Sequence, residues 1–205
     1  MTLIDNNNKL LNTVSYLAGA IEILSTKEMS SWRNYVKEQF KDKDIFFYDP
    51  VFQESLKVDT SCGSHNKVLA NLKKEGNYKE FLDHMWSIWA QNLPRTEPLV
   101  NILNHIRADK YLSGNTLEKM NRSADFEAVI RSDFIFVFLP KDTKTIGTIF
   151  EVCVAMLFNI PVYLVVPDDE KENINSSLLF AVQASHGRFF TSLDECINYI
   201  KRKYF

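Results

Sequence analysis

The sequence predicts an α/β protein in which a parallel β-sheet is flanked by helices. Three short apolar runs, at residues 13–18, 134–139 and 161–166, have the length and the β-branched or aromatic content of buried strands. Helical patterns separate these runs, and such alternation is typical of a parallel sheet with crossover helices. The pattern therefore predicts a Rossmann-like or flavodoxin-like sheet, and 205 residues are enough to bury its core.

The N-terminal part predicts a strand, a helix and a second strand. Residues 13–18 (TVSYLA) are an apolar run that stops at Gly19, as a buried strand does before a turn. Residues 45–48 (IFFY) predict the second strand, which is closed by Asp49-Pro50. Between the strands, apolar residues recur every four positions on one helix face, at Trp32, Val36 and Phe40.

The middle of the chain predicts a helical insertion at about residues 52–115, within a single domain of residues 1–205. The clearest helical patterns cover residues 81–91 and 99–112, and no clear strand lies between them. The first pattern carries an aromatic cluster that could line a pocket for a flat ligand. Aromatic residues at helical spacing are more often core, and we adopt that interpretation for Phe81, Met85, Trp86 and Trp89.

The C-terminal part predicts a β-loop-α-β unit. One helix is expected from Asn115 to about Ile130, and it leads into the strand FIFVFL at residues 134–139. A polar turn, an apolar helix to about Phe158 and the strand at residues 161–166 complete the unit. Ser192 and Glu195 form a capping box that opens a final helix.

Composition argues against several functional classes. The chain has 24 Lys and Arg residues against 26 Asp and Glu, and this balance lacks the basic footprint of a duplex-binding protein. Three cysteines without C-x-x-C spacing predict reduced thiols and a cytoplasmic location, not a disulfide framework or a zinc site. No apolar stretch predicts a membrane span. The isolated histidines His65, His84 and His105 predict no metal site.

One charged side chain does not fit a purely structural role. Glu151 is the only charged residue between Thr145 and Pro167, on a helix that is apolar nearly all round and therefore expected to be buried. Burying a carboxylate is costly unless hydrogen bonds or a helix dipole offset the loss of hydration. Glu151 could instead lie on a wet edge of the helix or cap an amide. We prefer a functional role, because ligands of open α/β sheets bind where such helices begin.

Three further side chains are candidates for the same site. Tyr16 approaches Glu151 if its strand and the 134–139 strand are parallel neighbours, and its phenol would then fix the carboxylate rotamer and favour the ionised form. Asp133 and Asp125 supply further acids, and two carboxyl groups in unequal environments suit acid-assisted glycosyl transfer. Each of these two residues fits an ordinary helix-end or surface acid equally well.

Together these residues resemble the nucleoside 2-deoxyribosyltransferase family, including its relatives that hydrolyse nucleoside 5′-monophosphates. VSYLAGAIE at residues 14–22 is similar to the family's Tyr-x-x-Gly strand and turn. SDFIFVFLP and GTIFEVCVAMLFNIPVYLVVPDD, at residues 132–140 and 147–169, are similar to its aspartate strand, Gly-x-x-x-Glu helix and closing strand. NINSS at residues 173–177 falls where the family has polar residues that reach the 5′ side of the sugar. These blocks cover a little under half of the chain.

The resemblance implies a role for each matched residue. Glu151 would attack the anomeric C1′, Tyr16 would hold and tune it, and Asp133 would face the leaving base. A carboxylate can trap the oxocarbenium character as a glycosyl ester, which water or a second base then resolves. The resemblance further implies no metal or other cofactor and a homodimer or higher homo-oligomer. The implied substrate-binding residues are Gly19, Glu22, Arg33, Asp125, Thr145, Gly147, Asn175 and Ser176.

Two departures from the family pattern bear on the substrate. The transferases have an acid six residues before the nucleophile, where this chain has Thr145, similar to the hydroxyl residue with which the monophosphate hydrolases hold phosphate. Glu22 stands where phosphate-binding members tend to carry Arg, and it would repel a phosphate unless Arg33 compensates. The sequence therefore leaves a nucleoside and its 5′-monophosphate both open.

The leading hypothesis is an enzyme that breaks the N-glycosidic bond of 2′-deoxynucleosides or their monophosphates, by transfer to another base or by hydrolysis. The alternatives are a nucleotide-binding or sensing module without catalysis, with the insertion as a partner surface, and an NAD glycohydrolase.

Overall fold

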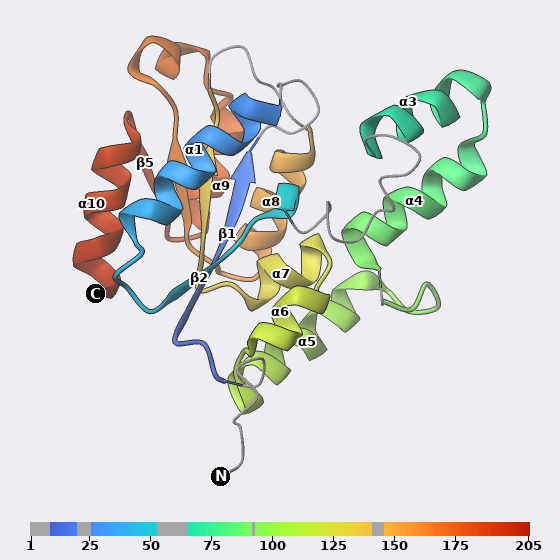
Figure 1. Cartoon of the computed structure of the whole chain (residues 1–205), viewed down its shortest axis with the longest axis horizontal. Coiled ribbons are helices and arrows are strands. Elements are labelled where there is room, and N and C mark those ends of the chain that lie inside the picture. The colour runs from blue at the N-terminus through green and yellow to red at the C-terminus, as the bar shows by residue number, and fades with distance from the viewer. Residues whose placement is uncertain (1–8, 20–25, 53–64, 92, 141–145) are drawn as a thin grey trace.

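A computed structural model describes residues 9–19, 26–52, 65–91, 93–140 and 146–205 (Figure 1). In these residues the sheet has five strands, all parallel, in the order β2-β1-β3-β4-β5. The α/β class and the Rossmann-like or flavodoxin-like arrangement that the sequence predicts are confirmed. The strands are β1 (Thr13–Gly19), β2 (Ile45–Tyr48), β3 (Phe134–Phe138), β4 (Val162–Val165) and β5 (Arg188–Phe190).

The short strand β5 was not predicted, because three residues are too few to show a periodic pattern. Its placement depends on the preceding glycine. A Cβ atom on Gly187 would come within 1.9 Å of the Val162 carbonyl oxygen, so only glycine allows the backbone to pass β4 this closely.

Helices connect the strands and cover both faces of the sheet. Their bounds are α1 (Thr26–Gln39), α3 (His65–Glu75), α4 (Tyr78–Ala90), α5 (Leu99–Ser113), α6 (Leu117–Arg122), α7 (Asp125–Arg131), α8 (Ile146–Leu157), α9 (Ser176–Ala184) and α10 (Leu193–Tyr204), with a 3₁₀ segment at Asp168–Asn173. The predicted N-cap of α10 is confirmed, since Ser192 Oγ accepts a hydrogen bond from the Glu195 amide at 3.2 Å, and the Glu195 side chain accepts from the Thr191 amide, one residue before the N-cap.

The single helix expected from Asn115 to Ile130 is wrong, because the chain forms α6 and α7 with a break at Ser123 and Ala124. Both break residues have extended backbone angles, and Ser123 Oγ donates to the Lys119 carbonyl at 2.8 Å. The break makes Asp125 the first residue of α7 and buries it, with 5% of its surface exposed.

The two faces of the sheet carry separate hydrophobic cores. Along β1, Val14, Tyr16 and Ala18 face the core formed with α7, α8 and α9, whereas Leu17 faces the core formed with α1 and α10. Trp32, Val36 and Phe40 of α1 join the second core, as their spacing predicts. The candidate acid helix α8 therefore belongs to the face toward which Tyr16 points.

Between β2 and β3 the described residues are mainly helical and contain no strand of the sheet. Figure 1 shows α3 and α4 extending away from the sheet, while α5 lies beside α6 and α7. The C-terminal end of α4 returns to the sheet side and contacts α7. None of the helices described is long and apolar enough to cross a membrane.

The expectation that α8 is buried on all sides is wrong for its outer face. Ile146, Phe150 and Leu157 are 72%, 56% and 72% exposed, and Ile149 is also exposed. The inner face is buried and includes Thr148, Glu151, Val152 and Ala155. Among the described residues, the apolar side chains of α8 thus form a buried inner face and a largely exposed outer face.

Candidate active site

The candidate site is built around a buried hydrogen bond between β1 and α8. Tyr16 lies in the middle of β1 and has no exposed surface, and Glu151 of α8 is 5% exposed. The Tyr16 hydroxyl donates to Glu151 Oε1 at 2.5 Å. The short distance is that of a charge-assisted O–H···O⁻ bond. The contact between these two residues that the sequence predicts is therefore present, and the alternative of a solvent-exposed Glu151 is not.

A second acid and a second phenol adjoin this pair. Asp125, at the start of α7, lies close enough to Tyr16 for its charge to act on the phenol. The Tyr48 ring at the end of β2 stacks on the Tyr16 ring, with 5.4 Å between their centroids. The Tyr48 hydroxyl donates to the Ser123 carbonyl at 2.8 Å, at the break that starts α7. The four side chains thus come from two strands and two helices that the fold brings to one place.

The site holds Tyr16 in its neutral form. Burial is the main cause that raises the pKa of the Tyr16 phenol well above its usual value, and the negative charges of Asp125 and Glu151 raise it further. Near neutral pH the phenol is therefore a proton donor to the carboxylate and not itself a base. Two acids of unequal surroundings beside one phenol can serve as a nucleophile and a proton donor.

Asp133 does not join this group, and the expectation that it faces a leaving base is wrong. It lies at the amino end of β3, where Oδ2 accepts from the Val14 amide at 2.8 Å and Oδ1 accepts from Lys110 Nζ at 2.7 Å. Both of its carboxylate oxygens are thus used to join β1, β3 and α5. Asp133 therefore serves the amino edge of the sheet, whereas Tyr16 and Glu151 meet on one face of the sheet.

Arg33 and Gly19 form a separate buried contact at the end of β1. The Arg33 side chain is fully buried, its Nη2 donates to the Gly19 carbonyl at 3.2 Å, and its Nε lies 3.5 Å from Asp49 Oδ1. These contacts hold the guanidinium at the end of β1, and its expected compensation of a substrate phosphate stays a prediction, because Glu22 lies outside the described residues. A Cβ atom on Gly19 would come within 2.8 Å of the Phe138 carbonyl and 2.9 Å of Trp32, so glycine is required by crowding.

The remaining candidates lie on or beside α8 and α9. Gly147 is in the first turn of α8, against the ring of Trp89. Asn175 caps α9 by accepting from the Ser177 amide at 2.8 Å, and Asn175 and Ser176 are exposed. Within this chain they are not in the group around Glu151. Glu22 and Thr145 lie outside the described residues.

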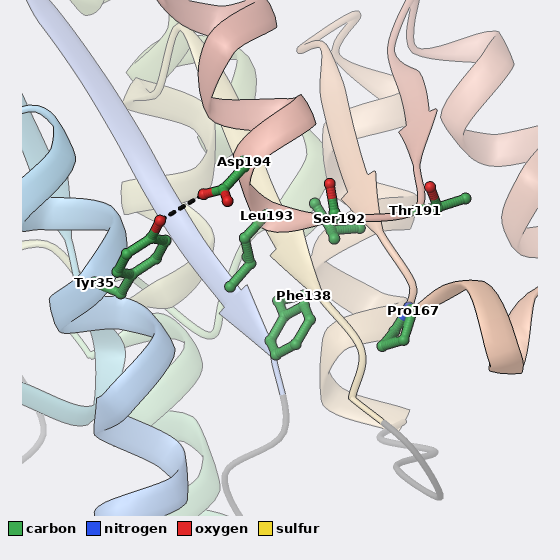
Figure 2. A pocket seen from close by; sticks show the side chains of 8 residues that line it. Tyr35, Phe138, Pro167, Thr191, Ser192, Leu193 and Asp194 are labelled. Atoms are coloured by element: carbon green, nitrogen blue, oxygen red, sulfur yellow. Dashed lines mark hydrogen bonds between the residues drawn. The ribbon is translucent and has the colours of Figure 1, made fainter.

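Two cavities are lined by other residues. One, of about 330 Å³, lies at the carboxyl ends of β3 and β4 and the start of α10, where the Tyr35 hydroxyl donates to Asp194 at 2.5 Å (Figure 2). The other, of about 590 Å³, lies along β2 and α1. Neither of these two cavities includes Tyr16, Asp125 or Glu151 in its lining.

Sequence reasoning missed Tyr48, although its position gave a signal. It ends the strand that precedes Asp49-Pro50, so it stands at the carboxyl end of the neighbour of β1. In the part of the chain that the structure describes, no group of three or more His, Cys, Asp or Glu side chains could hold a metal ion.

Comparison of the chain with protein-family models and with curated proteins found no match.

Proposed function

We propose that this protein cleaves the N-glycosidic bond of 2′-deoxynucleosides or their 5′-monophosphates, with Glu151 as the nucleophile. The buried hydrogen bond between Tyr16 and Glu151 carries this proposal, because it holds a carboxylate away from water in one rotamer. Burying a carboxylate lowers the stability of the fold, which favours a functional reason for it. An oriented carboxylate is suited to attack on an electrophilic carbon. The sequence resemblance to deoxyribosyltransferases supports the choice of substrate.

The reaction follows double displacement at C1′. A Glu151 oxygen bonds to C1′ as the C1′–N bond breaks, and the bonding electrons leave with the base nitrogen. Asp125, which must carry a proton in the substrate complex, gives that proton to the departing base and recovers one from the water or second base that attacks next. Tyr16 keeps its own proton and releases the Glu151 oxygen as the ester forms. Water or a second base then attacks C1′, restores the Glu151 carboxylate and completes hydrolysis or transfer.

The test is release of free base from a panel of deoxynucleosides and their 5′-monophosphates, followed by chromatography. We expect release by the natural protein and none above background by Glu151→Gln. Adding a second base separates the outcomes, because an exchanged nucleoside indicates transfer and free sugar indicates hydrolysis. Equal release by both proteins would contradict the assignment of Glu151.

The apolar outer face of α8 supports a homodimer or higher homo-oligomer as the working form. The neighbouring helix α9 also exposes an apolar side chain, with Phe180 65% exposed, and neither helix carries a charged residue apart from the buried Glu151. A surface of this kind is typical of a protein interface. Light scattering should give an oligomer for the natural protein, a monomer for Leu157→Glu with Phe180→Glu, and no change for Leu112→Glu on α5, whose leucine is 88% exposed. A monomeric natural protein would exclude this assembly.

We also propose a cytoplasmic location, which the free thiols of Cys153 and Cys196 support.

A second candidate is a nucleotide-binding module without catalysis. It is favoured by the cavity at the carboxyl ends of β3 and β4, which is the usual ligand position in such sheets and does not include Glu151. A nucleotide that binds by calorimetry, remains intact over long incubation and loses affinity in Tyr35→Ala would favour this candidate over the enzyme.

A further inference from the structure

The end of α4 carries a tryptophan that lies against the first turn of the acid helix. The Trp89 ring is 4.9 Å from the Phe126 ring of α7 and 6.3 Å from the Phe150 ring of α8, between centroids. A Cβ atom on Gly147 would lie 3.4 Å from Cη2 and Cζ2 of the Trp89 indole. Trp89 thus joins the helical segment that leaves the sheet to both helices that supply the candidate acids.

The position of Trp89 relative to Glu151 follows from helix geometry. Gly147 precedes Glu151 by four residues, so the two lie on one face of α8, about 6 Å apart along the axis. Phe126 directly follows Asp125 in α7. The indole therefore covers the strip of surface one turn from the candidate nucleophile and next to the second acid.

This spacing suits the base of a nucleoside. A nucleophile attacks C1′ from the side opposite the leaving base, so the base must lie beyond the sugar and not on the carboxylate. An aromatic ring one helical turn from the carboxylate can stack a base, while the sugar lies between the ring and the carboxylate. A glycine at position 147 leaves the indole edge in contact with bare backbone, and a side chain longer than alanine would have to displace it.

Trp89 also differs from its neighbour on the same helix. Trp86 packs on the main core and donates from Nε1 to the Leu93 carbonyl at 3.2 Å, as a structural tryptophan does. Trp89 is partly buried, as Trp86 is, but it contacts two aromatic rings from other helices. Trp86 thus stabilises the packing of α4, whereas Trp89 positions its ring against α7 and α8.

We infer that Trp89 is the stacking surface for the substrate base, and that the α4 segment thereby sets base preference. This inference rests on the proposed function and adds a specificity-determining residue to it. A bicyclic purine covers more of an indole than a pyrimidine does, so the contribution of Trp89 is larger for purine nucleosides.

The test measures binding in the absence of turnover. Calorimetry with 2′-deoxyadenosine and 2′-deoxycytidine is performed on Glu151→Gln, alone and combined with Trp89→Ala, Trp89→Phe or Trp86→Phe. We expect Trp89→Ala to weaken deoxyadenosine binding about tenfold or more and deoxycytidine binding less, in line with base–aromatic stacking. Trp89→Phe should retain most of the affinity, and Trp86→Phe should match the parent. Thermal melting of each variant checks the fold.

The outcomes separate the two proposals. If Trp89→Ala binds both nucleosides as well as the parent does, or if Trp86→Phe loses as much affinity, the inference about Trp89 is wrong while base release by the natural protein still supports the enzyme. If Trp89→Ala weakens both nucleosides equally, the purine preference is wrong. If no nucleoside binds and the natural protein releases no base, the proposed function fails and this inference fails with it.

Discussion

Glu151 and Asp133 are both acids hydrogen-bonded to residues of β1, and their partners differ in kind. Asp133 accepts from the Val14 amide and pairs with Lys110, whose side chain is 11% exposed. Glu151 accepts from the neutral phenol of Tyr16, with Asp125 acting on the same phenol. A cation and an amide stabilise the ionised carboxylate and so add to the stability of the fold. A neutral donor orients the carboxylate, but a nearby acid raises the free energy of its ionised form.

Both acids accept hydrogen bonds, so hydrogen bonding alone does not mark a reactive acid. The nature of the partners does. Further ion pairs lie near Asp133, since Arg131 contacts Asp109 at 2.9 Å and Glu127 at 2.9 Å. The acids at Tyr16 lie outside these ion pairs, so we expect their loss to affect chemistry more than stability.

The largest expected effect is on base release by Glu151→Gln. The amide still accepts from Tyr16, so the fold and the melting temperature should be retained. Loss of the nucleophile should lower the rate by about 10³-fold or more. Asp133→Asn is the matched acid-to-amide control and should release base at the natural rate. A comparable fall in both variants would remove the distinction between the two acids.

The next effect is that of Tyr16→Phe. The phenyl ring keeps the stacking on Tyr48 but leaves Glu151 without its phenol donor. We expect the rate to fall about 10- to 100-fold and stability to fall by about 1–3 kcal/mol, because a buried acceptor loses its partner. Steady-state rates and urea unfolding measure the two. A variant with unchanged kcat would show that the phenol only supports packing.

Asp133→Asn should in turn affect stability. Removing the carboxylate leaves the Lys110 ammonium, whose pKa burial already lowers, without its charge partner. Because Asp133 is partly exposed, we expect a loss of about 1 kcal/mol, a fall in melting temperature of roughly 3 °C. Calorimetric scans of the variant and the natural protein test this. An unchanged melting temperature would mean that Lys110 finds another partner.

The smallest effect concerns pH and Asp109. The hydrogen bond from Ser113, followed by those from Arg131 and Lys119, lowers the pKa of Asp109 from 3.8 to about 2. A carboxyl whose pKa is lower in the folded protein contributes stability above about pH 4, and that contribution is lost as the pH falls toward 2. Asp109→Asn should therefore melt roughly 2 °C lower at pH 7 and converge with the natural protein near pH 2. A difference that persists at pH 2 would contradict this origin.

Much of the fold could be predicted because its signals are local. Residues 45–48 match β2, since Asp49-Pro50 ends the strand, and the long periodic patterns of α4 and α5 were found within a few residues. The break at Ser123 was missed because it contains neither glycine nor proline. The exposed outer face of α8 could not be predicted, because composition does not distinguish packing on this chain from packing on another.

The part of the site that could be predicted is the part that depends on which strands are neighbours in the sheet. Tyr16 and Glu151 meet because β1 and β3 are adjacent and parallel, which the apolar runs indicate. The error at Asp133 came from its place beside a core strand, since a sequence pattern shows that an acid flanks a strand but not which partners the opposite edge supplies. The burial of Asp125 depends on the helix break, and Trp89 depends on how α4 returns to α8. Both are consequences of tertiary packing.

The most direct test of the Glu151 assignment is the mass of the protein after incubation with a 2′-deoxy-2′-fluoronucleoside. The fluorine disfavours oxocarbenium character at C1′ and should slow the resolution of a glycosyl ester. We predict release of free base and a fluorinated deoxyribosyl adduct on the peptide that contains Glu151, absent from Glu151→Gln. Base release without that adduct, or the same adduct in Glu151→Gln, would contradict the account.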